Sequence, residues 1–589
     1  MRHFIVTEQQ AGKLPRWALL LLCALYVFPG LIGREPWRTS DAPGFATALT
    51  MVRGTWQDWL IPNIAGELLI DDGPLAYALL AAVNKFASLV FGSPALNSPW
   101  PHWIAMLCAA SGLILMLTAF WYAAYELAKR PGLLPLDPFG AAASRVSFAR
   151  AIADTALLVF IGTLGLLVRM HEISSAAAQV TWVAGFLWSL SIGLENPRRG
   201  AAGAALACAA IFATRNPLLA LGMALVPFIL CAWAPAYRLI RVRFLPLFLV
   251  ATVLGFSIWP VLVLFTLEPS NLVVTDFLGT SPEQYLRQRV ALNVQALQGP
   301  TLFGVAYLAR TMPWYFWPAW PLAAYAVWQW RAKLTEPSLA LPVALLGVMG
   351  LLILLNPNPG EEHLAAAAPA IALLAAPSLT TLRRSLVNMI DWFAVMCFSF
   401  IGFALWLYWL ALITGQPERV SFRAAQFAPT FTLGPVWLEI LLGGLASASW
   451  LLLVRWRISR QPPMIWRAVV LSASGLTLVW FLLMTLWLPV LNERMGFRST
   501  AESLGRAYVQ ASSSTKVNCV NTQQLELAPR ASFFYFANLQ FARDEIRCPF
   551  VLEQSSPDRA LPSENGRLIW KGFVPAYRQD EFRLYQRAR

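Results

Sequence analysis

Long apolar runs, repeated almost end to end as far as Val490, restrict the fold of this chain more than any other feature. A helix needs about 20 mainly apolar residues to cross the hydrocarbon core of a bilayer. The 589 residues are 58% hydrophobic and only 13% charged, a balance that a soluble protein of this size does not need. The sequence therefore predicts a polytopic α-helical membrane protein.

Thirteen spans fit the hydropathy pattern. Lys and Arg gather in alternate turns between them, which by the positive-inside rule puts those turns and N-terminal residues 1–16 in the cytoplasm and the C-terminus outside. No small-x-small site follows the first span, so we interpret it as an uncleaved signal anchor. The predicted spans are 17–33, 102–127, 152–169, 175–193, 201–214, 217–235, 245–267, 313–329, 338–355, 364–380, 388–414, 432–454 and 467–490.

Segment 75–99 is also apolar, but Asn84 and Lys85 lie in its middle. As a span it would invert the sidedness of every later basic cluster, so we expect a helix that lies in the interface. The net charge of +14 does not indicate a nucleic-acid partner, because the basic residues form short clusters between spans rather than a basic face with interleaved aromatics.

The first external loop, predicted over residues 34–101, carries the strongest functional pattern. Asp41 lies eight residues after the first apolar run ends at Gly33, and a helix is expected from about Gly44 to Arg53. A Trp-rich turn and the acidic pair Asp71–Asp72 follow, before Gly73-Pro74. A carboxylate at the membrane surface can deprotonate a hydroxyl group, although a polar loop that solvates the end of a span is an alternative.

This order of features resembles the first extracytoplasmic loop of the GT-C glycosyltransferases. It is similar to that of bacterial lipid A aminoarabinose transferases and of the dolichyl- or polyprenyl-phosphate-mannose protein mannosyltransferases. The resemblance implies inverting transfer of a hexosyl or pentosyl group from a polyprenyl-phosphate donor to a periplasmic acceptor, which is lipid A, another glycolipid or a protein. Asp41 matches the catalytic Asp of the family and is expected to be the general base. Three positions depart from the pattern: Ala42 replaces Glu, Gly44 replaces Arg, and Asp72-Gly73-Pro74 replaces Glu-Lys-Pro, which removes a donor-binding Lys.

Further site residues follow from the resemblance and from their places at span ends. Cations are needed because negative charge grows on the leaving phosphate, and Arg suits phosphate contacts. Arg215, in an Arg-Asn-Pro element, matches a family Lys-Gly/Asn-Pro element. The expected set is Glu172 as a second catalytic acid, Arg215, Arg169 and Arg310 as phosphate ligands, and Asp71, Asp72 and His363 on the acceptor side. An interfacial carboxylate at a helix end remains the alternative for Glu172.

The sequence predicts no cofactor. No Cys or His cluster has zinc spacing, and no Gly-rich nucleotide loop is present. A divalent cation held by Asp41, Asp71, Asp72 and Glu172 stays open.

Composition changes near Gly496, where charges of both signs mix with short strand-like pieces at 516–521, 549–554 and 567–574. We expect residues 496–589 to form a small α/β or α+β periplasmic domain behind a GT-C module of residues 17–495. Five of the seven cysteines fall in predicted spans, whereas Cys519 and Cys548 fall in this domain. Such a pair fits a disulfide in an oxidising compartment, with two free buried thiols as the alternative.

The alternative function is a transporter or flippase of lipid-linked glycans. It would show inverted repeats and ionisable residues at mid-bilayer depth, whereas the charges here gather at span ends. We therefore expect a monomeric glycosyltransferase of the bacterial inner membrane, with its active site on the periplasmic side.

Overall fold

The computed structural model describes residues 6–31, 33–38, 40–90, 100–130, 132, 143–266, 282–427, 429, 434, 436–459, 464–512, 519–523, 525–542, 548–555, 566–574 and 577–587. Several sequence predictions lie partly outside these residues. They include residues 91–99 of the interfacial segment, 432–433 of the twelfth predicted span and 516–518 of the first strand-like piece.

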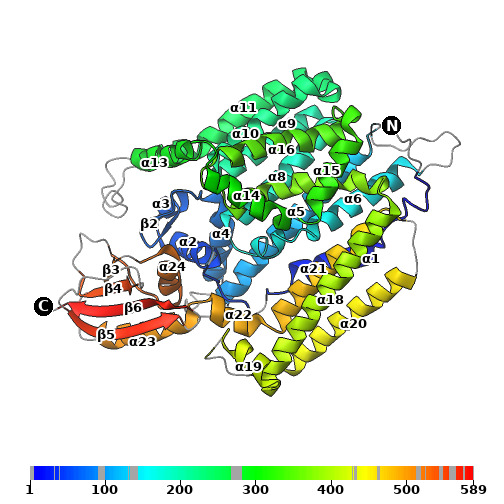
Figure 1. Ribbon diagram of the computed structural model, residues 1–589. Coiled ribbons are helices and arrows are strands. Elements are labelled where there is room, and N and C mark those ends of the chain that lie inside the picture. The colour runs from blue at the N-terminus through cyan, green and yellow to red at the C-terminus, as the bar shows by residue number, and fades with distance from the viewer. Residues whose placement is uncertain are drawn as a thin grey trace.

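Long helices form most of the molecule (Figure 1). Eight of the described helices are long and apolar enough to cross a membrane, so the thirteen-span count stays a prediction. The bundle consists of α1 (Arg16–Val27), α5 (Trp100–Ala128), α6 (Arg145–Ile161), α8 (Ser175–Gly193), α9 (Pro197–Thr214), α10 (Pro217–Trp233), α11 (Pro235–Thr266), α14 (Leu302–Tyr315), α15 (Ala319–Gln329), α16 (Pro337–Leu355), α17 (Glu361–Ala375), α18 (Arg384–Thr414), α20 (Trp437–Ser459) and α21 (Arg467–Thr485).

Local sequence sets several helix ends. Helices α9, α10 and α16 begin with Pro, whose missing N–H costs nothing in the first turn. The side chains of Ser144 and Asn216 accept hydrogen bonds from the third residue of α6 and α10, as N-caps do. Two predicted spans were wrong in their bounds. The 152–169 span is α6, which ends at Ile161, followed by a turn and the short α7 (Leu166–Arg169), and the 313–329 span is divided between α14 and α15.

Burial orders the helices into a centre and a rim. Nearly all of α6, α17 and α21 is buried. By contrast, α11, α18 and α20 leave most of their apolar side chains fully or partly exposed. An apolar helix surface that faces outward is what lipid contact requires, so these rim helices suit a bilayer.

The turns between helices lie at two opposite ends of the bundle (Figure 1), and the end with the Lys- and Arg-rich turns is called the basic end. At the basic end, Glu8 accepts from Ser144 N–H, and Lys333 donates to the carbonyl of Gly132. At the other end lie the first loop and the short elements around it. They are α2 (Asp41–Arg53), α3 (Trp56–Leu60), β1 (Asn63–Ile64), β2 (Glu67–Leu68), α4 (Leu75–Val90), α7 and α13 (Pro282–Gln295).

The C-terminal part adds a four-stranded sheet at the same end as the first loop (Figure 1). Its strand order is β3-β4-β6-β5, with β3 parallel to β4 and the other pairs antiparallel. The elements of this part are α22 (Leu488–Met495), α23 (Arg498–Ser512), β3 (Val520–Gln523), α24 (Leu527–Phe536), β4 (Phe550–Ser555), β5 (Gly566–Val574) and β6 (Tyr577–Arg587), and α19 (Glu418–Ala425) follows α18. Strand β6 was not predicted from the sequence.

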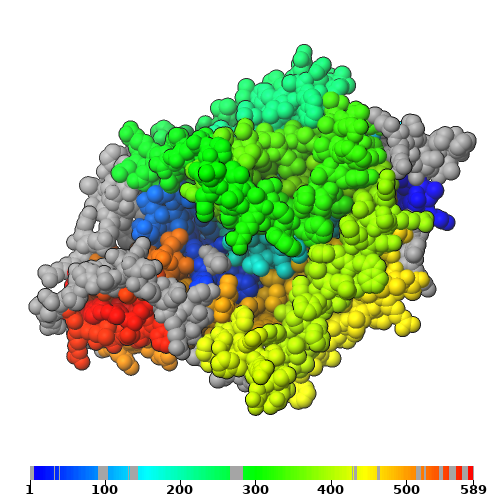
Figure 2. Space-filling model, in the orientation of Figure 1, coloured from blue at the N-terminus to red at the C-terminus, as the bar shows by residue number. Residues whose placement is uncertain are grey.

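Cys519, directly before β3, and Cys548, shortly before β4, are joined by a disulfide. In Figure 2 the blue atoms of the first loop lie between the green atoms of the middle of the chain and the orange and red atoms of this C-terminal part. The first loop is therefore enclosed by both.

Candidate active site

Asp41 is the first residue of α2, where a carboxylate is favoured by the helix dipole. The helix therefore starts three residues earlier than the Gly44 predicted from sequence. The Asp41 side chain is fully buried, forms an ion pair with Arg34, and accepts a hydrogen bond from the Ile173 N–H at 2.6 Å. Arg34 also donates to the carbonyl of His171 at 2.8 Å and lies over the Trp37 ring. Asp41 thus ties the first loop to the segment between α7 and α8.

His171 lies in the same buried junction. Its ring nitrogens are 2.6 Å from the carbonyl oxygen of Leu167 and 2.7 Å from that of Tyr26. Burial lowers the pKa of His171 to about 4, so the ring is neutral at physiological pH. Because His171 is neutral, the positive charge of Arg34 and the negative charge of Asp41 compensate each other in this buried junction.

Two glycines explain where the first loop departs from the GT-C pattern. A Cβ atom at Gly44 would lie 2.2 Å from the carbonyl oxygen of Ile173, and one at Gly73 would lie 2.1 Å from that of Ala213. Gly73 N–H also donates to the carbonyl of Thr214 at 2.7 Å. An Arg at 44 or a Lys at 73 does not fit these close backbone contacts.

Asp72 is the centre of a second polar cluster. It accepts hydrogen bonds from Tyr77 Oη and from Ser175 Oγ, both at 2.6 Å. Arg215, just after the end of α9, donates to Ser175 Oγ at 3.2 Å, with its nearest nitrogen 3.7 Å from Asp72 Oδ1. Burial acts to lower the pKa of Arg215, but the carboxylates of Asp72 and Glu362 raise it above its usual value, so Arg215 stays charged.

A cavity of about 450 Å³ opens beside this cluster. Its polar wall contains Asp71, Asp72, Arg169, Arg215 and Glu362, and its apolar wall contains Leu68, Leu69, Ile70, Leu292 and Leu527. Asp71 is exposed in it, and among the described residues no side chain or backbone group forms a hydrogen bond or ion pair with its carboxylate. Asp41 does not line the cavity, although its neighbours Ser40 and Pro43 do.

A small, mainly apolar groove of about 40 Å³ lies beside the cavity, between α10, α16 and α17. Leu218, Leu219, Met349, Leu352 and Ile353 line it, and its polar end holds Arg215, Glu362 and His363. Arg215 and Glu362 belong to both the groove and the cavity. The two spaces therefore meet at one cation.

The sequence matches no family model and no curated protein. Its structure, however, is similar to crystal structures of ArnT from Cupriavidus metallidurans. The one bound to undecaprenyl phosphate has a TM-score of 0.62 and 12% identity over 96% of this chain and 97% of that one. The one in the apo state has a TM-score of 0.59 and 13% identity over 97% of each chain. The chain has the ArnT-like GT-C fold. This confirms the fold class predicted from the sequence.

Of the remaining predicted site residues, some line the cavity or the groove and others do not. Arg169 lines the cavity and donates to Glu361 at 3.1 Å, Glu172 at 3.3 Å and Ser40 at 3.4 Å. Glu172 is buried and lies outside the cavity wall. Arg310 is exposed on α14 and lines neither the cavity nor the groove.

His363 is held at the start of α17. Its Nδ1 accepts from the Gly360 N–H at 3.1 Å, and its Nε2 lies 3.1 Å from Asn356 Nδ2. Within the described residues, no group of three or more His, Cys, Asp or Glu is placed to hold a metal ion.

Sequence reasoning missed Arg289. From α13, Arg289 donates to the backbone carbonyls of Ile70 at 2.8 Å, Asp72 at 2.7 Å and Arg215 at 2.6 Å. It also lies over the ring of Trp259. Burial lowers the pKa of Arg289. Tyr77 and Ser175 were missed as well, because a single hydroxyl group near a span end carries no distinctive pattern.

The C-terminal part completes the wall. Leu527, the first residue of α24, lines the cavity, and Arg530 donates to the carbonyls of Ile64 at 3.3 Å and Ala65 at 3.2 Å. Both carbonyls belong to the β1–β2 hairpin region, where Ala65 and Gly66 have positive φ as a two-residue hairpin turn requires. The C-terminal part is therefore built into the site.

Proposed function

We propose that this protein transfers a sugar from a polyprenyl-phosphate carrier to a hydroxyl group of an acceptor in the 450 Å³ cavity. The observation that carries the proposal is the place of Arg215, where a polar cavity and an apolar groove meet. A polyprenyl-phosphate sugar has the same order of parts, namely a sugar, an anionic phosphate and a long apolar tail. The ArnT-like fold supports the same conclusion, since one ArnT crystal structure holds undecaprenyl phosphate.

In this proposal the first part of the isoprenoid tail enters the small groove between α10, α16 and α17. The phosphate lies against Arg215, with Arg169, which also lines the cavity, as a second cation and His363 in the groove. Guanidinium groups stabilise the charge that grows on the phosphate as the sugar leaves. Arg215 then supplies the positive charge that the Lys missing at position 73 does not provide.

The acceptor hydroxyl attacks the anomeric carbon while the bond from that carbon to the phosphate oxygen breaks, which inverts the configuration. Its proton goes to a carboxylate, and polyprenyl phosphate leaves with the bonding electrons. Asp71 is best placed to accept the proton, because it faces the cavity and no described protein group is paired with it. Asp41, the base expected from the resemblance, then holds the loop through Arg34 and Ile173, and Asp72 orients Arg215.

The acceptor reaches the cavity past Leu68, Leu292 and Leu527. An acceptor with an apolar portion beside its hydroxyl fits this wall, and a glycolipid such as lipid A fits better than a protein. The resemblance and the basic turns favour the bacterial inner membrane as the location, with the cavity on the periplasmic side.

The first test is mass spectrometry of lipids extracted from cells with and without the gene. The proposal expects loss of the gene to accumulate a polyprenyl-phosphate sugar and to leave a glycolipid lighter by one sugar. Unchanged amounts of both, in cells that make the protein, would contradict it.

A second test measures binding of undecaprenyl phosphate to the purified protein. Arg215→Met is expected to weaken binding strongly, whereas Arg310→Met, which removes an exposed Arg outside both spaces, is the matched control. If both substitutions weakened binding equally, Arg215 would not be part of the donor site.

A further inference from the structure

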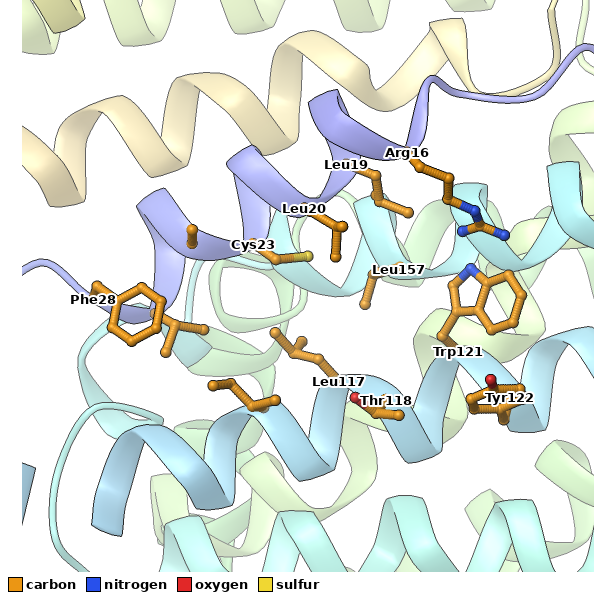
Figure 3. A pocket seen from close by; sticks show the side chains of 13 residues that line it. Arg16, Leu19, Leu20, Cys23, Phe28, Leu117, Thr118, Trp121, Tyr122 and Leu157 are labelled. Atoms are coloured by element: carbon orange, nitrogen blue, oxygen red, sulfur yellow. The ribbon is translucent and has the colours of Figure 1, made fainter. Parts of the chain in front are cut away.

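A second apolar groove follows α1 from Arg16, at the basic end of the bundle, and shares no lining residue with the cavity at Arg215 (Figure 3). It has a volume of about 310 Å³ and lies between α1, α5 and α6. Leu20 and Cys23 of α1, with Phe28 directly after it, line one side, and Ile114, Leu117 and Thr118 of α5 line the other. Several of these side chains are open to the outside, including Leu20, which is 66% exposed.

The groove has a polar end formed by Arg16. The guanidinium lies 4.8 Å above the Trp121 ring, and its side chain is 50% exposed. Its one ion-pair partner among the described residues is Asp154, at a long 3.5 Å. That same carboxylate oxygen already accepts the Trp121 indole N–H at 2.8 Å. Arg16 therefore keeps N–H donors for an anion, which it is well suited to bind.

The length of the groove matches one leaflet of a bilayer. From Arg16 to Phe28 a helix rises about 18 Å at about 1.5 Å per residue, and half of a hydrocarbon core is about 15 Å. Trp121 and Tyr122 flank the Arg16 end, at the depth where aromatic side chains meet headgroups. The charge is thus at headgroup level and the apolar walls are at acyl-chain level.

We propose that this groove is a binding site for a glycerophospholipid of the leaflet on the basic side. One acyl chain lies between α1 and α5, and the phosphate contacts Arg16. This site is separate from the cavity at Arg215, and the proposal does not depend on the proposed function.

The test uses the full-length protein in liposomes that contain a trace of phosphatidylglycerol with a photoreactive diazirine in one acyl chain. After illumination, labelled peptides are identified by mass spectrometry. We expect labelling of 20–28 and 114–118 several-fold above that of the exposed face of α20. Even labelling over all rim helices would overturn the proposal.

Two pairs of variants sharpen the test. Thr118→Phe fills the groove from an exposed position, and Ser449→Phe makes the same kind of change on α20. Arg16→Gln removes the cation, and Arg198→Gln removes another exposed Arg at the same end. Only the first member of each pair should lower labelling of the groove, because only these alter the site.

A diacylglycerol that carries the same diazirine tests the phosphate contact. It should label the groove more weakly than phosphatidylglycerol and should not respond to Arg16→Gln. Equal labelling by both lipids would show that Arg16 does not contact the phosphate, and that part of the proposal would be wrong.

Discussion

The first loop contributes the acidic residue of two ion pairs, and these pairs differ in burial and in what surrounds them. The Arg34–Asp41 pair is sealed, with side-chain exposures of 2% and 0%, whereas the Arg215–Asp72 pair is open, with 28% and 15%. Asp41 contacts Arg34 and the Ile173 N–H, which hold the first loop in place. Arg215, by contrast, lines both the cavity and the groove. Removing one partner of a buried pair leaves an uncompensated buried charge, whereas a cation that is partly open can also contact a ligand.

The largest effect expected from this contrast is on the rate. Asp71 lies next to the open pair, and Asp71→Asn removes the proton acceptor of the proposed reaction while it keeps the size of the side chain. We expect the transfer rate to fall about 10²- to 10⁴-fold. The midpoint of thermal unfolding should not change, because no described protein group pairs with the Asp71 carboxylate. A turnover assay with a synthetic polyprenyl-phosphate sugar measures this. If Asp71→Asn kept the wild-type turnover rate, Asp71 would not be the base, and Asp41 would again be the candidate.

The sealed pair should respond in the opposite way. Asp41→Asn leaves the buried Arg34 without a counter-charge, which typically costs about 3–5 kcal/mol in stability. Thermal unfolding in detergent is the measurement, and any loss of turnover should follow the loss of folded protein. Asp58→Asn is a suitable control, since Asp58 caps α3 and accepts from Asn63 Nδ2 but forms no ion pair among the described residues, and its loss should cost about 1 kcal/mol. Normal stability with no turnover would instead make Asp41 a catalytic residue.

The third effect falls on the open pair itself. Arg215→Met should lower turnover about 10²- to 10³-fold, the usual cost of losing one group that stabilises a developing anion. Stability should change little, because the Arg215–Asp72 pair is partly exposed and long at 3.7 Å. The comparison would break if Arg215→Met unfolded the protein as readily as Asp41→Asn does.

Much of this arrangement can be predicted from the sequence. The apolar runs, the basic turns and the order of motifs in the first loop predict a GT-C fold, which the structure confirms. Arg215, Arg169, Asp71 and Asp72 stand near span ends at one end of the bundle, and the cavity brings them together. Sequence position is enough here, because each lies at or close to the end of a helix or in the loop between helices.

The sequence does not show in which direction these side chains point. Asp41 begins α2 rather than preceding it, and this turns its carboxylate inward to Ile173. Gly44 and Gly73 read as losses from a motif, whereas the structure uses both for close backbone contacts. Arg289 donates to four backbone carbonyls in two distant segments, and no spacing in one sequence reveals such a contact.

A third pair on the first loop gives the smallest effect and calibrates the other two. Glu35 follows Arg34 and accepts from Arg498 of α23 at 2.9 Å, but the Arg498 side chain is 49% exposed and also pairs with Glu502. Burial raises the pKa of Glu35, and the nearby Arg498 opposes that rise. Arg498→Gln should therefore raise this pKa further and cost about 0.5–1 kcal/mol near neutral pH, where the carboxylate is charged. The cost should shrink as the pH falls and Glu35 takes up its proton, and it should shrink in high salt. Thermal unfolding at two pH values and two salt concentrations measures both trends. A loss as large as that of Asp41→Asn would mean that exposure does not separate structural pairs from ligand-binding ones in this protein.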